Sequence, residues 1–309
     1  MNCATQSVPK PTIPRGRHPA GHPNPHKLKH ADVDVTTSDG VQLAVRDYGP
    51  PSTRHTVVLL HGLCVSDEVW SLQVDYLLRR YGESIRVISY DHRGHGRSGR
   101  APVDTYRIDQ LASDLADVLI ALNVNGPLTL VGHSMGGMTA LAYLARPSAD
   151  RPVDPQGLVL AATTAGKLAQ RGLGRLLATP GAGALLTLVD RLPKQALNAL
   201  VGLACSTLSR IWPTQRAMLV AIAHAAANKP IPTATGFLPT LSRYDQYRTL
   251  GGIRAKTVVI SGGTDRLTPA SHSCDLVGAI PGAAHVHLPH AGHMLPRGVP
   301  DVINHAIRR

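Results

Sequence analysis

The segment Leu128–Leu144 constrains the fold more than any other part of the chain. An apolar run, Leu128–Val131, leads directly into Gly132-His-Ser-Met-Gly136-Gly, and an apolar, helix-like stretch follows. A strained turn between a strand and a helix has room only for small residues two positions before and two after its central residue. Gly132 and Gly136 occupy these positions around Ser134. The segment predicts a strand, a sharp turn and a helix whose N-terminal N–H groups point toward the raised Ser134 hydroxyl.

The chain from residue 31 onward alternates strand-like and helix-like segments. An apolar stripe over Ile108–Leu122 predicts a helix, and Ser38-Asp-Gly40 predicts the turn of a hairpin spanning Val33–Tyr48. Strands are predicted at six short apolar runs rich in β-branched residues: Thr56–Leu60, Arg86–Tyr90, Leu128–Val131, Gly157–Leu160, Thr257–Ile260 and His285–Leu288. Such alternation is typical of an α/β fold, with a mostly parallel sheet covered by helices on both faces.

Two segments depart from this alternation. Residues 1–30 contain six prolines, five Lys or Arg and no acid, so they cannot bury enough apolar surface to fold, and we expect a disordered tail. Residues 167–248 are rich in Ala and Leu, are interrupted by prolines and show no strand pattern. They predict a helical cap inserted into a single fold, whose core comprises residues 31–166 and 249–309.

The net charge of +12 is unevenly distributed. The tail contributes +5 and the cap +8, which leaves −1 for the core, so nucleic acid is not the expected partner. Histidines recur every fourth residue from His18 to His30 (His18, His22, His26 and His30), but the prolines between them exclude the helix that would align them on a metal. The four cysteines form no CxxC pair, and no apolar signal segment follows Met1. We therefore expect a cytoplasmic protein.

An acid and a base are needed to activate Ser134, because a serine hydroxyl is a poor nucleophile at neutral pH. Asp265 follows the predicted strand Thr257–Ile260, whereas no acid follows Leu160, the usual alternative position. Asp is also common in loops as a turn or capping residue, so that role stays open for Asp265. The chain order of serine, acid and histidine favours Asp265 as the orienting acid.

Four histidines near the C-terminal end compete for the role of base: His285, His287, His290 and His293. His285 and His287 alternate along the last predicted strand and should point to its solvent-facing side. His293 lies in the loop beyond that strand, and Gly292 before it gives the backbone freedom to turn the imidazole toward Ser134. We predict His293 as the base and keep His290 as a lesser candidate.

Acyl transfer also requires about two N–H donors for the oxyanion. Met135 directly follows Ser134, so its amide is the first candidate. The strand Thr56–Leu60 ends in His61-Gly-Leu-Cys64, where Gly62 lets the chain turn and Leu63 supplies the second amide. Cys64 is predicted to be a buried thiol near this loop, because no second histidine and acid accompany it.

These motifs together resemble the α/β-hydrolase superfamily over Val33–Arg309. The resemblance rests on five segments in family order: His61-Gly-Leu63, Asp91-His-Arg-Gly-His-Gly-Arg-Ser98, Gly132-His-Ser-Met-Gly-Gly137, Gly262-Gly-Thr-Asp-Arg-Leu-Thr-Pro269 and Gly292-His293. It implies an eight-stranded, mostly parallel sheet with a helical cap, no metal and no organic cofactor, and a mainly structural loop at 91–98. Capped esterases, monoacylglycerol-lipase-like enzymes and haloperoxidase-like enzymes are the most similar groups. A serine at position 134 argues against the relatives with an aspartate nucleophile.

The expected function is hydrolysis of a carboxylic ester through an acyl-enzyme, with Ser134, Asp265 and His293 as the triad and Leu63 and Met135 at the oxyanion hole. The many apolar residues of the cap suggest a substrate with an apolar acyl chain or a lipid, and its positive charge suggests contact with an anionic membrane surface. Solubility among cellular polyanions is an alternative explanation of that charge. A thioester, lactone or carbon–carbon bond is an alternative substrate for the same triad, and a non-catalytic binding protein is the alternative from a different class.

Overall fold

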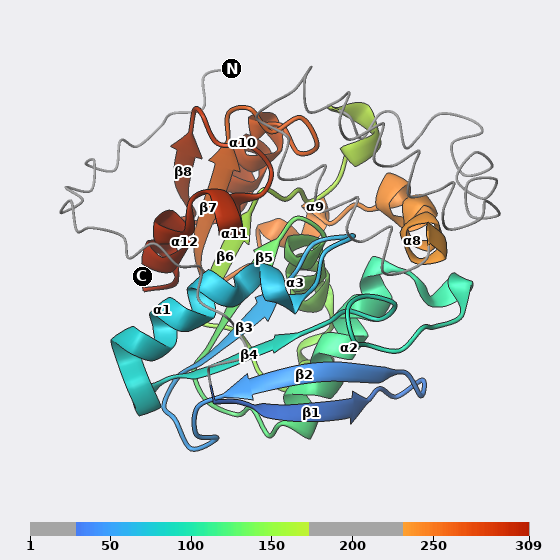
Figure 1. Ribbon diagram of the computed structural model, residues 1–309. Coiled ribbons are helices and arrows are strands. Elements are labelled where there is room, and N and C mark those ends of the chain that lie inside the picture. The colour runs from blue at the N-terminus through green and yellow to red at the C-terminus, as the bar shows by residue number, and fades with distance from the viewer. Residues whose placement is uncertain (1–28, 173–230, 309) are drawn as a thin grey trace, which may run out of the picture.

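A computed structural model describes residues 29–172 and 231–308 of the chain. Its centre is one eight-stranded sheet in the order β1-β2-β4-β3-β5-β6-β7-β8 (Figure 1). The strands are β1 (Ala31–Thr36), β2 (Gln42–Tyr48), β3 (Thr56–Leu60), β4 (Arg86–Tyr90), β5 (Leu128–His133), β6 (Gly157–Ala161), β7 (Lys256–Gly262) and β8 (Ala284–Leu288). β2 runs antiparallel to both β1 and β4, and all other neighbours are parallel. The predicted fold class, an eight-stranded and mostly parallel sheet, is confirmed.

The predicted strands lie at or within two residues of the observed ones. β3 and β4 coincide with the predicted segments, and the other four begin or end one or two residues further out. The predicted hairpin forms between β1 and β2, and Gly40 in its turn adopts a φ of +86°, a conformation that glycine adopts without steric cost.

Helices cover both faces of the sheet because the strands are apolar on both faces. Val57 and Leu59 of β3 pack with α1 (Ser71–Tyr81), α11 (Leu295–Gly298) and α12 (Pro300–Ile307). Val58 and Leu60 belong to the second core, on the side of α2 (Ile108–Ala121), α3 (Met135–Ala145) and α10 (Ala270–Ala279). Short 3₁₀ turns lie at Asp67–Trp70, Gly82–Ser84, Val103–Thr105, Ser148–Asp150 and Leu168–Gln170. Figure 1 shows α1 and α12 on one side of the sheet and α2 on the other.

The two ends of the predicted cap meet at the edge of the core. Gly166 and Asp245 form a β-bridge, and the Gln246 N–H donates to the Ala165 carbonyl at 2.7 Å. The C-terminal part of the cap segment forms α8 (Ile231–Arg243) and α9 (Tyr247–Leu250). The tail up to residue 28 and residues 173–230, which carry most of the predicted cap, lie outside the described residues. The domain boundaries therefore stay a prediction. No helix among the described residues has the length and apolar character needed to cross a membrane.

The parallel strands all end at the same edge of the sheet, which positions the candidate site. The loops after β3, β5, β7 and β8 meet there, and they carry the residues singled out from the sequence. Ligand sites of open α/β sheets characteristically lie outside the carboxyl ends of the strands.

Candidate active site

Ser134 occupies a strained turn between β5 and α3. Its backbone adopts φ +53° and ψ −118°, outside the regions that residues with a side chain normally use. A Cβ atom on Gly132 would lie 2.5 Å from the Gly137 Cα, and one on Gly136 would collide with the Leu60 carbonyl oxygen. The glycines at these two positions are therefore required by the close approach of neighbouring backbone, as the sequence predicted.

Neighbouring strands hold this turn in place. The Ser134 N–H donates to the Ala161 carbonyl at 3.0 Å, which ties the turn to the end of β6. The Thr163 hydroxyl donates to the Ser134 carbonyl at 2.7 Å from the segment that follows β6. With both backbone groups of Ser134 bonded, its strained geometry is fixed by the sheet, and the partly buried side chain lies at the carboxyl edge.

Asp265 lies in the loop after β7 with four donors around its carboxylate. The Leu267 and Thr268 N–H groups donate to Oδ1 at 2.8 and 3.0 Å. The Thr268 hydroxyl and His293 Nδ1 lie 2.7 and 2.8 Å from Oδ2. Burial alone would raise the pKa of Asp265, but the attraction of His293 and the hydrogen bonds from His293 and Thr268 outweigh it and hold that pKa below its usual value. Asp265 is therefore a buried carboxylate that stays ionised at neutral pH.

His293, in the loop after β8, connects Asp265 with Ser134. Because a carboxylate only accepts, Nδ1 carries the proton toward Asp265, and Nε2 faces the Ser134 Oγ at 3.0 Å as an acceptor. His293 is only 5% exposed. The structure thus brings the three predicted residues together in one chain of hydrogen bonds, although Ser134 and His293 are 159 positions apart in the sequence.

The other candidate bases lie elsewhere. His290 is exposed at the end of β8. His285 Nε2 and His287 Nδ1 each lie 2.9 Å from the Ser261 hydroxyl on β7. Both side chains are partly buried on the edge strand β8, and they share this polar partner on the neighbouring strand.

The loop after β3 carries Leu63, the predicted second oxyanion donor. The His92 N–H donates to His61 Nε2 at 2.9 Å, so the proton of His61 must be on Nδ1, which lies 2.7 Å from the Gly62 carbonyl and donates to it. All peptide bonds here are trans, so the Leu63 N–H points to the opposite side from the bonded Gly62 carbonyl, away from the His61 ring. Burial lowers the pKa of His61, despite the opposing effects of Asp91 and Gly62, and this keeps the ring neutral.

Met135, the other predicted donor, is the first residue of α3. The N–H groups of the first helical turn have no acceptor within the helix, so the Met135 amide can serve a ligand next to Ser134.

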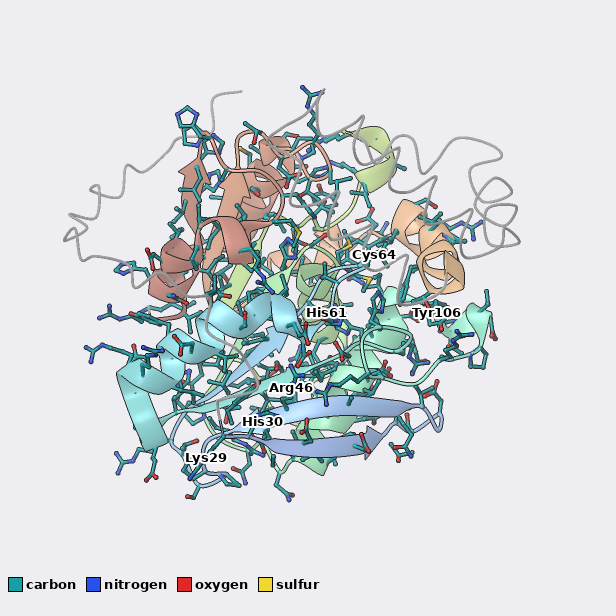
Figure 2. The ribbon with its side chains drawn as sticks, viewed as in Figure 1. Lys29, His30, Arg46, His61, Cys64 and Tyr106 are labelled. Atoms are coloured by element: carbon teal, nitrogen blue, oxygen red, sulfur yellow. The ribbon has the colours of Figure 1, made fainter. Side chains whose placement is uncertain are left out.

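Cys64 lies in the same loop in a left-handed conformation with φ +61°. Its N–H donates to His95 Nε2 at 3.3 Å, and burial raises the pKa of its thiol to about 11. The residue as a whole is partly rather than fully buried, and a thiol with such a pKa is a weak nucleophile at neutral pH. Figure 2 shows Cys64 and His61 near each other and Tyr106 farther along toward α8, where the Tyr106 ring lies 5.2 Å from the Phe237 ring.

Sequence reasoning missed several residues that shape this site. Thr268 contacts the proposed acid, His61 and His92 hold the loop of the proposed oxyanion donor, and His133 contacts the backbone of the proposed base. All four lie in the segments that carry the family resemblance, but no role was assigned to their side chains. The segment Asp91–Ser98 has the structural role that the resemblance implied, since Asp91 accepts from the Asp67 and Arg97 N–H groups. Within residues 29–172 and 231–308, no group of three or more His, Cys, Asp or Glu side chains is arranged to hold a metal.

Comparison with known proteins finds partial sequence matches to several enzymes. A bifunctional esterase/perhydrolase from Acinetobacter calcoaceticus is 38% identical over 112 residues, 36% of this chain and 38% of the relative. A non-heme chloroperoxidase from Streptomyces lividans matches with the same identity, length and coverage. The chain thus aligns with little more than a third of the length of these curated relatives.

Solved structures match over nearly the whole fold. A hydrolase from Pseudomonas aeruginosa PA01 is 26% identical with a TM-score of 0.68, covering 89% of this chain and 96% of that one. An esterase from Thermogutta terrifontis is 25% identical with a TM-score of 0.68, covering 90% and 97%. Residues 55–296, more than half of the chain, match the family described as alpha/beta hydrolase fold. The chain therefore belongs to the α/β hydrolase family.

Proposed function

We propose that this protein hydrolyses carboxylic esters through an acyl-enzyme formed on Ser134. The observation that carries the proposal is the hydrogen-bonded chain from Asp265 to His293 at 2.8 Å and from His293 to the Ser134 hydroxyl at 3.0 Å, ending on a serine in a strained turn. These distances lie within the reach required for a nucleophile and its general base.

The reaction follows from the polarity of these bonds. His293 Nε2 accepts the hydroxyl proton while Ser134 Oγ attacks the ester carbonyl, and the carboxylate of Asp265 stabilises the imidazolium that forms. His293 then gives this proton to the leaving alcohol, which produces the acyl-enzyme. A water molecule repeats the sequence and releases the acid. The amides of Met135 and Leu63 are the donors for the oxyanion, and the bonding of the Gly62 carbonyl to His61 supports this role by fixing the peptide that carries the Leu63 N–H.

A fluorophosphonate probe tests the nucleophile. We expect it to label the wild type and not Ser134→Ala, while the matched variant Ser242→Ala, at a partly exposed serine on α8, should label like the wild type. Absence of labelling in the wild type, or equal labelling of Ser134→Ala, would refute the mechanism and favour a non-catalytic binding protein.

The choice of an ester as substrate has separate support. Relatives described as an esterase/perhydrolase and as an esterase share the family and the fold. Hydrolysis of p-nitrophenyl esters of two to twelve acyl carbons, measured beside a thioester and a lactone of equal chain length, ranks these bonds by kcat/KM. A higher kcat/KM for the thioester or the lactone would replace the ester in this proposal.

Contact with an anionic membrane is a further proposal, and it depends on the basic residues of the cap, most of which lie outside the described residues. Sedimentation with neutral and with anionic vesicles at low salt tests it. Equal partitioning to both kinds of vesicle would refute it.

A further inference from the structure

His133 is the last residue of β5 and directly precedes Ser134, yet its side chain is 1% exposed. Its Nε2 atom lies 2.9 Å from the carbonyl oxygen of His293, and the two imidazole rings are 5.0 Å apart between their centroids. The strand that carries the nucleophile therefore reaches the backbone of the base.

The partner of Nε2 fixes the protonation of this ring. A carbonyl oxygen only accepts, so Nε2 must carry the proton and Nδ1 must present its lone pair. In the described part of the structure, Nδ1 is buried without a hydrogen-bond partner, and burial together with the nearby His293 lowers the pKa of His133 to about 3. His133 is thus a neutral, single-tautomer ring, and it adds no charge beside His293 when that residue becomes an imidazolium.

The opposite side of the ring contacts the loop after β3. A Cβ atom on Gly62 would lie 3.0 Å from His133 Nδ1 and 3.2 Å from the Ser134 Cβ. Gly62 therefore packs directly on His133, and its own carbonyl orients the peptide that carries the Leu63 N–H. One flat ring separates the loop of the proposed oxyanion donor from the loop of the proposed base.

We infer that His133 is a positioning residue: it holds the backbone of His293 and the Gly62 loop at the distance from Ser134 that the proposed reaction requires. This inference rests on the proposed function, because it assigns His133 a part in the same site. The carbonyl of His293 also accepts from the Leu295 N–H at 2.8 Å. Loss of the His133 bond should therefore shift the base without releasing its loop.

Two substitutions separate the ring from its hydrogen bond. His133→Phe keeps a flat ring but removes the donor, whereas His133→Gln restores an N–H at about the reach of Nε2. A displacement of about 1 Å can reduce an enzymatic rate about 100-fold, so we expect kcat per active site to fall about 10- to 100-fold in His133→Phe with KM changed less than about twofold. His133→Gln should recover most of that loss.

The measurement combines active-site titration with steady-state kinetics on a p-nitrophenyl ester. Titration with a fluorophosphonate counts competent sites, so a folding defect does not count as a loss of kcat. His55→Phe is the control, because His55 bonds the Thr129 hydroxyl at 2.9 Å near the opposite end of the strands. We expect that variant to lose stability and to keep kcat.

Three results would overturn the inference: kcat within threefold of wild type in His133→Phe, a His133→Gln variant as impaired as His133→Phe, or an equal loss in His55→Phe. If His133→Phe does not fold, His133→Gln is compared with His133→Asn, whose shorter amide cannot reach the His293 carbonyl, and equal kcat values would overturn it. Failure of the wild type to react with the probe would instead refute the proposed function.

Discussion

Replacing Asp265 by Asn tests the proposed triad because the structure predicts how the new amide orients. The carboxylate is surrounded by donors of two kinds. Oδ1 accepts from the Leu267 and Thr268 N–H groups, which cannot change direction. Oδ2 faces the Thr268 hydroxyl, which can rotate, and His293 Nδ1, which can lose its proton. The amide oxygen of Asn must therefore take the Oδ1 position, and its NH₂ group must face His293.

The consequence is a change of tautomer in the base. An NH₂ group donates, so His293 must accept through Nδ1 and carry its proton on Nε2, where it faces the Ser134 hydroxyl. A protonated Nε2 cannot accept the serine proton. The equivalent substitution in serine proteases lowers kcat about 10⁴-fold, which corresponds to about 5.5 kcal/mol of transition-state stabilisation, and we expect a loss of that order here.

Steady-state kinetics on p-nitrophenyl butyrate, corrected by active-site titration, measures this loss. Asp275→Asn is the matched control, since it removes an α10 carboxylate that pairs with Arg171 at 2.9 Å. We expect the control to keep kcat within about threefold, because its charge lies outside the proposed relay. An Asp265→Asn variant that retains a tenth of wild-type kcat would refute the tautomer argument and, with it, the role of Asp265.

Three further predictions concern the turn, a buried carboxyl and the thiol. Gly136→Ala should cost about 1–3 kcal/mol of stability and abolish probe labelling, because its Cβ meets the Leu60 carbonyl. The control Gly278→Ala, which has open space on α10, should gain about 0.5–1 kcal/mol in urea unfolding. A stable, labelled Gly136→Ala would contradict the prediction. Burial and the nearby Asp91 raise the pKa of Asp67 from 3.8 to about 6. At a pH between these two values the folded state keeps a proton that the unfolded state has released, so the free energy of unfolding falls as the pH rises toward about 6. The difference in unfolding free energy between Asp67→Asn and wild type should therefore move in favour of the variant as the pH rises from 4.5 to 7.5. A difference that stays constant over this range would count against the prediction. Burial raises the pKa of the Cys64 thiol to about 11, so this thiol should react with iodoacetamide at pH 8 about 100-fold more slowly than a free cysteine. Mass spectrometry of the alkylated peptide measures the rate, and a rate equal to that of free cysteine would contradict the prediction.

The sheet was predictable from the sequence because its parallel strands are buried on both faces. Such strands appear as short, uninterrupted apolar runs, and β3 and β4 match the predicted segments residue for residue. The turn at Ser134 was predictable for a different reason: only glycine satisfies the steric demand at positions 132 and 136. Both patterns are local, so a single sequence contains them.

The supporting hydrogen bonds could not be predicted, because they join segments distant in the chain. His133 reaches the His293 carbonyl across 160 positions, and His92 reaches His61 across 31. Nothing in the composition around a histidine indicates which carbonyl or N–H it will meet. The shared contact of His285 and His287 was missed for the same reason, since it depends on Ser261 in the neighbouring strand.

The order of the proposed triad along the chain has a consequence for biosynthesis. Ser134 leaves the ribosome 159 positions before His293, which at about 5–20 residues per second is about 8–30 s earlier. Throughout that interval the serine is an ordinary alcohol, because its base has not been made. The base arrives only after β8, the strand at one edge of the sheet. On the proposed mechanism, a nascent or partly folded chain therefore carries no activated serine that a passing acyl donor could acylate, and reactivity begins only when the final strand docks.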